Sequence, residues 1–201
     1  DTPEKGFSTR FNGRLDMRMN QRSAVDAASV VNTYDVSSLA SILSRYGELR
    51  NSMAIADAIV MSREVKPIET TDELKEAVAR FLVRGSENKI LAQIFQALRI
   101  EVNGEMGALR DLLMHSAKVL RPGGRLSIIS YHSLEDRMVK NLIRSGDVSK
   151  QNAEQDIYGH CAVPYEAVNR KVVVPSEEEI ERNSRARSAK LRIAERTDVD
   201  V

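Results

Sequence analysis

The stretch "YHSLEDR", residues 131–137, places an aromatic ring, an imidazole, a hydroxyl and two carboxylates close together in the sequence. An aromatic ring can stack on a flat ligand, an imidazole can accept a proton, and a hydroxyl and two carboxylates can form hydrogen bonds. The stretch follows "RPGGRLSIIS", where a Pro-Gly-Gly turn precedes an apolar, β-rich run. Because open α/β sheets form sites at the carboxyl ends of strands, the sequence predicts Tyr131, His132, Ser133, Glu135 and Asp136 at such a site.

The same residues also have explanations that need no substrate. His132 could be a hydrogen-bonded structural histidine, and Tyr131 could cover the edge of the core. Glu135 and Asp136 fall in the first turn of a helix that Ser133 could cap. The two interpretations are compatible, and both stay open.

The segment "LDMRM" places Asp16 and Arg18 two residues apart, with Met17 and Met19 beside them. One interpretation is a loop that covers a bound ligand or base. The other is a buried arginine–aspartate pair with the methionines as core filler. Asn103, at the end of a predicted helix, could likewise face a pocket or cap the helix.

The tail "RNSRARSAKLRIAER", residues 182–196, concentrates positive charge in a chain whose net charge is only +1. Arginine suits phosphate because its planar guanidinium donates two parallel hydrogen bonds, so this tail is a candidate contact to a nucleic-acid backbone. A solvated surface strand is the alternative. The basic residues are Arg182, Arg185, Arg187, Lys190, Arg192 and Arg196, against Glu195 alone.

The composition limits which classes of protein this chain can belong to. With 201 residues and 42% hydrophobic residues, the chain can bury a sizeable core. Its single cysteine, Cys161, excludes an internal disulfide framework and a multi-cysteine zinc site, and we expect no metal. No apolar run approaches the roughly 18 to 20 residues that span a bilayer, and we expect a cytoplasmic protein.

The spacing of apolar residues predicts the helices and strands that must position these residues. The first twenty residues read as a loop, and five helices are predicted between residues 23 and 105, with Asp35 and Thr70 as caps. Their apolar positions, for which no function is expected, include Met53, Ile55, Ile59, Leu91 and Phe95.

Beyond residue 106, the sequence predicts a helix, a strand at "RLSIIS" covered on both faces, and a helix at "LEDRMVKNLIRSG". Residues 149–167 read as a loop, "KVVV" as a strand, "SEEEIERN" as a short helix and "AKLRIAER" as a last strand. Since sheets typically have about five or six strands, three would leave an apolar face and an edge unpaired.

Six blocks of the sequence together resemble the bacterial 16S rRNA (cytosine-N4)-methyltransferases of the RsmH/MraW type. They cover nearly the whole chain: "FNGRLDMRMN", "YGELRNSMAIADAIV", "PIETTDEL", "FQALRIEVNGEM", "LRPGGRLSIISYHSLEDRMVK" and "PSEEEIERNSRARSAKLRIAER". The resemblance implies an α/β fold, the C-terminal part of a Rossmann-like class I methyltransferase sheet with an inserted helical domain. It assigns 1–20 to a loop of the methyltransferase domain, 21–87 to the insertion and 88–201 to the later sheet.

The resemblance also implies an activity: S-adenosylmethionine-dependent N4-methylation of a cytidine in the decoding region of 16S rRNA. The family's glycine-rich donor-binding loop would lie before Asp1, so no cofactor-binding residue is predicted here. The expected catalytic residues are His132, Ser133 and Asp16. The expected RNA-binding residues are Arg18, Tyr131, Arg137, Arg185, Arg187 and Lys190.

The expected partner is 16S rRNA in the small ribosomal subunit, with a homodimer left open and no membrane. The alternative function is a non-catalytic RNA- or ribosome-binding module derived from the enzyme. The two differ in whether the chain binds the methyl donor, since no Gly-x-Gly-type segment of this chain replaces the missing loop.

Overall fold

The computed structural model describes residues 5–150, 162–169 and 171–199. Its contacts divide the chain into two compact units, a helical unit, Asp1–Glu105, and a sheet unit, Met106–Val201. Each unit has a hydrophobic core of its own. The two units are therefore treated separately.

The helical unit confirms the five predicted helices. Their bounds are α1 (Ala27–Thr33), α2 (Val36–Arg45), α3 (Ser52–Val65), α4 (Thr71–Ala77) and α5 (Glu87–Asn103), with a 3₁₀ turn η2 (Ala79–Phe81) after α4. Residues 70–85 thus form a short helix and a turn, where the pattern predicted one longer helix. Ile55, Ile59, Leu91 and Phe95 are buried as expected, but Met53 is 55% exposed and its assignment to the core was wrong.

Local capping explains where two of these helices begin. The Asp35 carboxylate accepts a hydrogen bond from the Ser38 N–H, as the sequence predicted. At α4, the Thr70 hydroxyl accepts from the Glu73 N–H, while the Glu73 carboxylate accepts from the Thr70 N–H. This reciprocal capping box satisfies N–H groups that have no partner within the helix.

Glu73 gives this cap a pH dependence that can be tested. The Lys66 ammonium and the N–H groups of Glu69 and Thr70 hold the pKa of Glu73 at about 2, below its ordinary 4.5. The ionised carboxylate therefore stabilises the folded state above pH 4.5, and this contribution is lost as the pH falls toward 2. We expect Glu73→Gln to be less stable than the wild type near pH 7, with the difference shrinking across that window.

Urea unfolding at a series of pH values measures this effect. Glu76→Gln, which removes the same charge from an exposed glutamate of α4, is the matched control. A stability difference for Glu73→Gln that stays constant between pH 7 and pH 2 would contradict the assignment.

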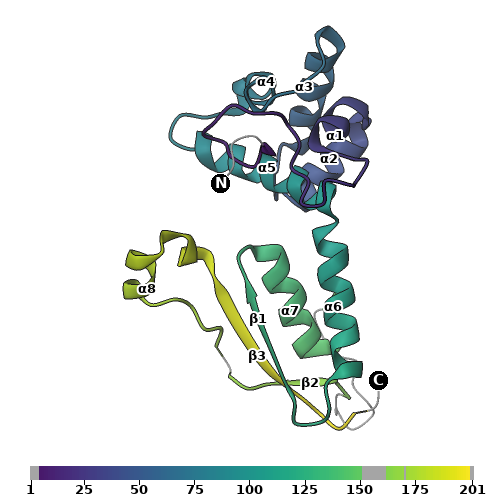
Figure 1. Cartoon of the computed structure of the whole chain (residues 1–201), viewed down its shortest axis with the longest axis vertical. Coiled ribbons are helices and arrows are strands. Elements are labelled where there is room, and N and C mark those ends of the chain that lie inside the picture. Colours follow the sequence, from purple (N-terminus) through teal and green to yellow (C-terminus); the bar gives the residue numbers. More distant parts are fainter. Residues whose placement is uncertain (1–4, 151–161, 170, 200–201) are drawn as a thin grey trace. The chain divides into compact units, whose positions relative to one another are not determined.

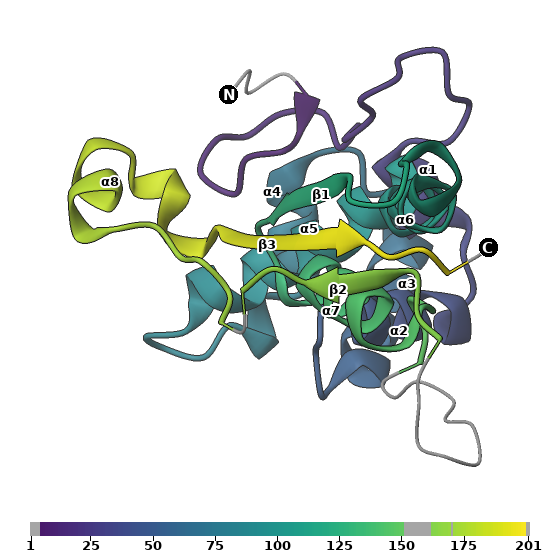
Figure 2. The same ribbon diagram turned by 90° about the horizontal axis from the view of Figure 1, so that it is seen from below.

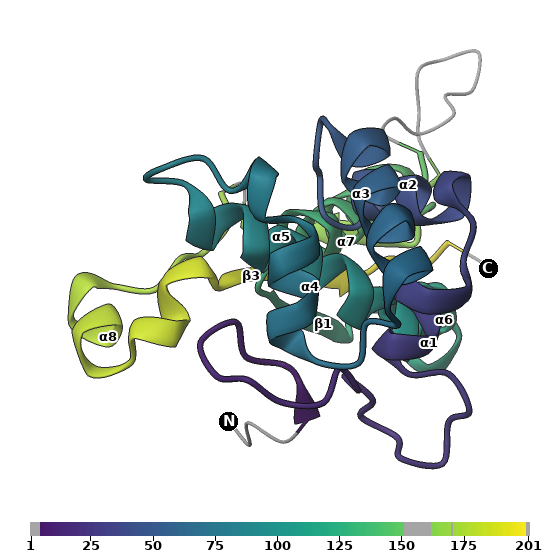
Figure 3. The ribbon, with the colours of Figure 1, turned by 90° about the horizontal axis from the view of Figure 1, so that it is seen from above.

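The N-terminal segment runs as a loop along the start of α4 and into α1 (Figure 3). The Leu15 N–H donates to the Glu69 carbonyl and the Thr71 N–H donates to the Gly13 carbonyl, at 2.8 and 2.9 Å. Leu15 and Met17 are fully buried in the helical core. The predicted loop is confirmed for its described residues, and it is an integral part of the helical unit.

The sheet unit contains three strands and the helices that pack on them (Figures 1 and 2). Both β1 and β2 pair antiparallel with β3, in the order β1-β3-β2. The elements are α6 (Glu105–Val119), β1 (Arg125–Ser130), α7 (Ser133–Ser145), β2 (Tyr165–Ala167), α8 (Glu177–Arg182), the 3₁₀ turn η3 (Ser184–Ser188) and β3 (Lys190–Arg196).

Two sequence predictions about this sheet were wrong. The strand expected at "KVVV" is reduced to a single bridge between Val173 and Leu191, and β2 forms within the stretch predicted as a loop. Residues 151–161 of that stretch lie outside the described residues. Tyr165 explains the difference, because its ring is fully buried and its hydroxyl lies 2.6 Å from Ser116 Oγ, which ties β2 to α6.

Within the described residues, β1 is covered on one face only, whereas the sequence predicted cover on both faces. Leu126 and Ile128 belong to the core with α6 and α7, together with Tyr165 and Ala194. On the other face of β1, Ile129 is 58% exposed. The sheet is therefore packed on one face only within the described part of the chain.

Candidate functional site

The loop between β1 and α7 places Tyr131, His132 and Ser133 together, as the sequence predicted. His132, rather than Ser133, is the N-cap of α7, and its Nδ1 accepts a hydrogen bond from the Glu135 N–H at 3.4 Å. Glu135 reaches back and accepts from the N–H groups of Tyr131 and His132, at 2.8 and 3.3 Å. The loop is thus held in a capping box. The structural roles of His132 and Glu135 are confirmed, but the prediction that Ser133 caps the helix was wrong.

The second ring nitrogen of His132 has no hydrogen-bond partner among the described residues. His132 Nε2 is buried and lies 3.3 Å from Glu135 Oε1, but the geometry of that contact is not that of a hydrogen bond. Burial raises the pKa of Glu135, yet the His132 ring and the Tyr131 N–H more than offset this and leave that pKa below its ordinary value. A buried polar atom without a partner is uncommon and calls for an explanation.

Asp136 joins α7 to β3. Its carboxylate accepts from Arg192 Nε at 2.7 Å and Arg192 Nη2 at 3.2 Å, and Lys190 Nζ lies 3.4 Å away. Burial raises the pKa of Asp136, but the hydrogen bonds and charges of Arg192 and Lys190 outweigh it and hold the pKa below the ordinary range. Sequence reasoning missed this pair, because it joins residues 56 positions apart.

Three other predicted residues of this region lie at the surface. Tyr131 is 57% exposed. Ser133 and Arg137 are exposed, and each makes an interaction within the chain. An exposed aromatic ring next to a strand end is free to stack on a base.

In the helical unit, Asp16 and Arg18 form the buried pair that was one of the two interpretations. Arg18 Nε and Nη2 donate to the two carboxylate oxygens of Asp16, at 2.8 and 2.7 Å. Arg18 Nη1 donates to the Ser23 carbonyl at 2.7 Å. The hydrogen bond from the Arg18 side chain lowers the pKa of Asp16. Met17 is core filler, whereas Met19 is 65% exposed.

Asn103 fixes the same loop from the end of α5. Its Nδ2 donates to the Met17 carbonyl and its Oδ1 accepts from the Met19 N–H, at 2.8 and 2.7 Å. Nδ2 also donates to the Arg99 carbonyl, one turn back in α5. This loop attachment was not among the sequence expectations, since it links positions 84 and 86 residues apart.

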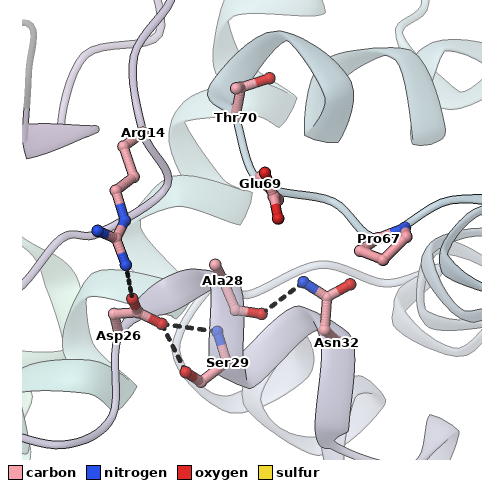
Figure 4. Close-up of a pocket in the computed structure, with 8 residues that line it drawn as sticks. All are labelled: Arg14, Asp26, Ala28, Ser29, Asn32, Pro67, Glu69 and Thr70. Atoms are coloured by element: carbon pink, nitrogen blue, oxygen red, sulfur yellow. Dashed lines mark hydrogen bonds and ion pairs between the residues drawn. The ribbon is translucent and has the colours of Figure 1, made fainter.

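A pocket of about 590 Å³ lies in the helical unit, between the N-terminal loop, α1 and the segment before α4 (Figure 4). Its polar groups bind one another: Arg14 contacts Asp26 at 3.3 Å, and Asp26 accepts from the Ser29 N–H and hydroxyl. Asn32 donates to the carbonyls of Ala28 and Ile68. These pairs account for the polar lining as part of the fold.

The basic tail forms η3 and β3. Arg185 and Arg187 are exposed on η3, and the Lys190 side chain, near Asp136, is 41% exposed. Arg196 is buried instead, where its Nε donates to the Ala117 carbonyl at 3.0 Å. The tail therefore divides into exposed cations on η3 and cations that stabilise the sheet unit on β3.

The glycines of the Pro-Gly-Gly turn do not provide an anion-binding loop. The Gly123 N–H donates to the Arg196 carbonyl and the Gly124 N–H donates to the Arg121 carbonyl, at 2.8 and 2.9 Å. Both N–H groups are used within the sheet unit, one by β3 and one by the turn itself, so the turn does not fit a nucleoside donor as a glycine-rich loop would. We find no group of His, Cys, Asp or Glu that could hold a metal among the described residues.

No helix in the described ranges is long and apolar enough to cross a membrane.

Comparison with known proteins decides the family. Residues 1–197 match the MraW methylase family. The chain belongs to this family. The family match spans both structural units, so the helical unit and the sheet unit are parts of one family sequence.

Relatives of this chain carry the name ribosomal RNA small subunit methyltransferase H. Those from Phocaeicola vulgatus and Cytophaga hutchinsonii are 54% identical over 196 residues, and one from Flavobacterium johnsoniae is 52% identical. Each alignment covers 98% of this chain. It covers 64% of the relative from Phocaeicola vulgatus, 65% of that from Cytophaga hutchinsonii and 64% of that from Flavobacterium johnsoniae. The chain thus spans about 64% of the length of the first of these relatives.

Proposed function

We propose that the whole protein transfers a methyl group from S-adenosylmethionine to N4 of a cytidine in the decoding region of 16S rRNA. The observation that carries this proposal is the family match over residues 1–197, together with the 54% identity to small-subunit rRNA methyltransferases. The substrate is then 16S rRNA in the small ribosomal subunit. A homodimer and a cytoplasmic location stay predictions.

The sheet supports a larger Rossmann-like architecture as part of this proposal. The strand β1 pairs only with β3 among the described residues, so its other edge can accept a further strand. The exposed Ile129 lies on the face opposite the core of α6 and α7, where further helices could pack. We propose that, in the whole protein, β1 is an inner strand of a methyltransferase sheet and residues 21–87 of the helical unit are an insertion into that domain.

Methyl transfer depends mainly on how the methyl donor and the acceptor amine are positioned. The exocyclic amine must lie in line with the methyl group, and a proton must leave the nitrogen after transfer. Tyr131 is suited to stack on the base, while His132 and Ser133, at the head of α7, are the proposed acceptor-side groups. Asp16 stays a proposed catalytic residue. The proposed RNA contacts are Arg18, Arg137, Arg185, Arg187 and Lys190. We assign the donor to no residue of this chain.

The test uses the 201-residue chain and a protein of the relatives' full length. We expect the longer protein to bind S-adenosylmethionine with one-to-one stoichiometry in calorimetric titration. It should also transfer a labelled methyl group to small-subunit particles, and nuclease digestion should place the label on cytidine N4. The 201-residue chain should bind RNA and not the donor.

Label on another nucleotide would overturn the proposed position. RNA binding by the longer protein without donor binding and without transfer, across assembly states of the small subunit, would support a non-catalytic ribosome-binding module instead.

A further inference from the structure

A second pocket, separate from the β1–α7 loop, lies in the sheet unit between α7 and β2. Its volume is about 280 Å³. Its lining comes from α7, from β2 and β3, and from Asn169, Lys171 and Val172 after β2; Figure 2 shows α7 beside these two strands. The lining residues that matter here are Lys140, Arg144, Ala167, Asn169, Lys171 and Arg192.

Among the described residues, the pocket gathers positive charge without matching acids. Lys140 and Arg144 are four residues apart on α7 and so share one face of the helix. These two residues and Lys171 are exposed, and no ion pair is seen for any of them within the described ranges. Arg192 alone has an acidic partner, Asp136. Glu166, next to Ala167 in β2, points to the opposite face of the sheet because side chains alternate along a strand.

These features define the ligand as a small oxyanion. Like charges repel, so three unpaired cations around one pocket favour an anion between them. Arginine and lysine donors match the oxygens of a phosphate, while the Asn169 amide donates to the Lys171 carbonyl at 3.0 Å and fixes the segment that carries Lys171. A volume of 280 Å³ is at the lower limit of pockets that enclose whole cofactors, which favours a phosphate group over a complete nucleotide cofactor.

We propose that this basic pocket binds a backbone phosphate of the RNA whose target base lies at the head of α7. Lys140 and Arg144 follow His132 by eight and twelve residues, which is about 12 to 18 Å along a helix that rises 1.5 Å per residue. At that distance the pocket meets the RNA strand at the phosphate of another nucleotide than the target. The inference rests on the proposed function for the identity of the anion.

The test removes the pocket's charge in the full-length protein. The pocket variant is Lys140→Ala/Arg144→Ala/Lys171→Ala. The control variant, Arg110→Ala/Lys118→Ala/Arg121→Ala, removes three exposed positive charges from α6 and the following turn. The measurement is the affinity for a labelled small-subunit rRNA fragment at 50 to 300 mM salt. We expect the pocket variant to bind about tenfold more weakly and its salt slope to fall by about 1, as for one lost phosphate contact.

A second variant tests the pocket independently of whether the triple variant folds. Ala167→Glu places a carboxylate on the exposed floor of the pocket and removes no cation. It should weaken RNA binding by a similar factor and reduce the shift of the Arg144 and Arg192 side-chain NMR signals on addition of inorganic phosphate. Phosphate shifts in the wild type without any RNA effect of the variants would show a site for free phosphate and overturn the RNA assignment.

The inference and the proposed function can fail separately. If the pocket and control variants lose RNA affinity equally, the pocket is not a specific phosphate site, although methyl transfer by the wild type would stand. If the wild type transfers no methyl group but the pocket variants still lose RNA affinity selectively, only the proposed activity fails.

Discussion

Replacing Arg18 with methionine should destabilise the helical unit more than the loss of an exposed ion pair would, because the buried carboxylate of Asp16 loses the guanidinium and keeps the N–H of residue 18. Asp16 is 7% exposed and both of its oxygens accept hydrogen bonds from the Arg18 guanidinium. Methionine keeps a comparable chain in place but donates no hydrogen bond, and the Ser23 carbonyl loses its donor as well. Urea unfolding near pH 7, followed by circular dichroism of the helices, measures the loss.

The unit offers a matched control in Arg14→Met. Arg14 also pairs with a buried carboxylate, Asp26, but at 3.3 Å, and its own side chain is 68% exposed. Exposed pairs contribute about 0 to 1 kcal/mol, so this variant should change stability little. The double variant Asp16→Asn/Arg18→Met should recover part of the loss, because it removes the buried charge. Equal effects of Arg14→Met and Arg18→Met would mean that the buried pair does not stabilise the loop.

Periodicity and caps predicted most of the helical unit, for a local reason. The apolar spacing that marks a helix repeats within about four residues, and the Asp35 and Thr70 caps bind residues three positions away. Met53 shows the limit of the method. It satisfies the apolar spacing of α3, but the pattern does not say how far the core extends around the helix, and Met53 is exposed.

Long-range pairing in the sheet unit was harder to predict. The valines of "KVVV" have high strand propensity, yet β2 forms at Tyr165, where a buried ring and its hydroxyl contact with Ser116 determine the pairing. Likewise, the pattern placed His132, Glu135 and Asp136 at the correct strand end, but it could not distinguish their partners. Asp136 binds Arg192 of β3, and His132 caps α7.

His132→Asn separates the structural role of His132 from its proposed role in catalysis. Asparagine is among the best N-cap residues, so it should keep the hydrogen bond from the Glu135 N–H and leave stability within about 1 kcal/mol of the wild type. It removes the imidazole, whose buried Nε2 lacks a hydrogen-bond partner in the described part of the chain. If that nitrogen acts on the acceptor base in the complex, methyl transfer by the full-length protein should fall about 100-fold or more.

The kinetics of that variant distinguish the two roles of the head of α7. A group that acts only during transfer should lower kcat and leave the affinity for the rRNA fragment nearly unchanged, because the ground-state complex is intact. Tyr131→Ala is the contrasting variant: an exposed ring that stacks on the base contributes to binding, so its loss should weaken RNA affinity by roughly tenfold, while Tyr131→Phe should retain it. Full turnover by His132→Asn would leave His132 as the cap of α7 alone, and the search for the proton acceptor would then move to Ser133 and Asp16.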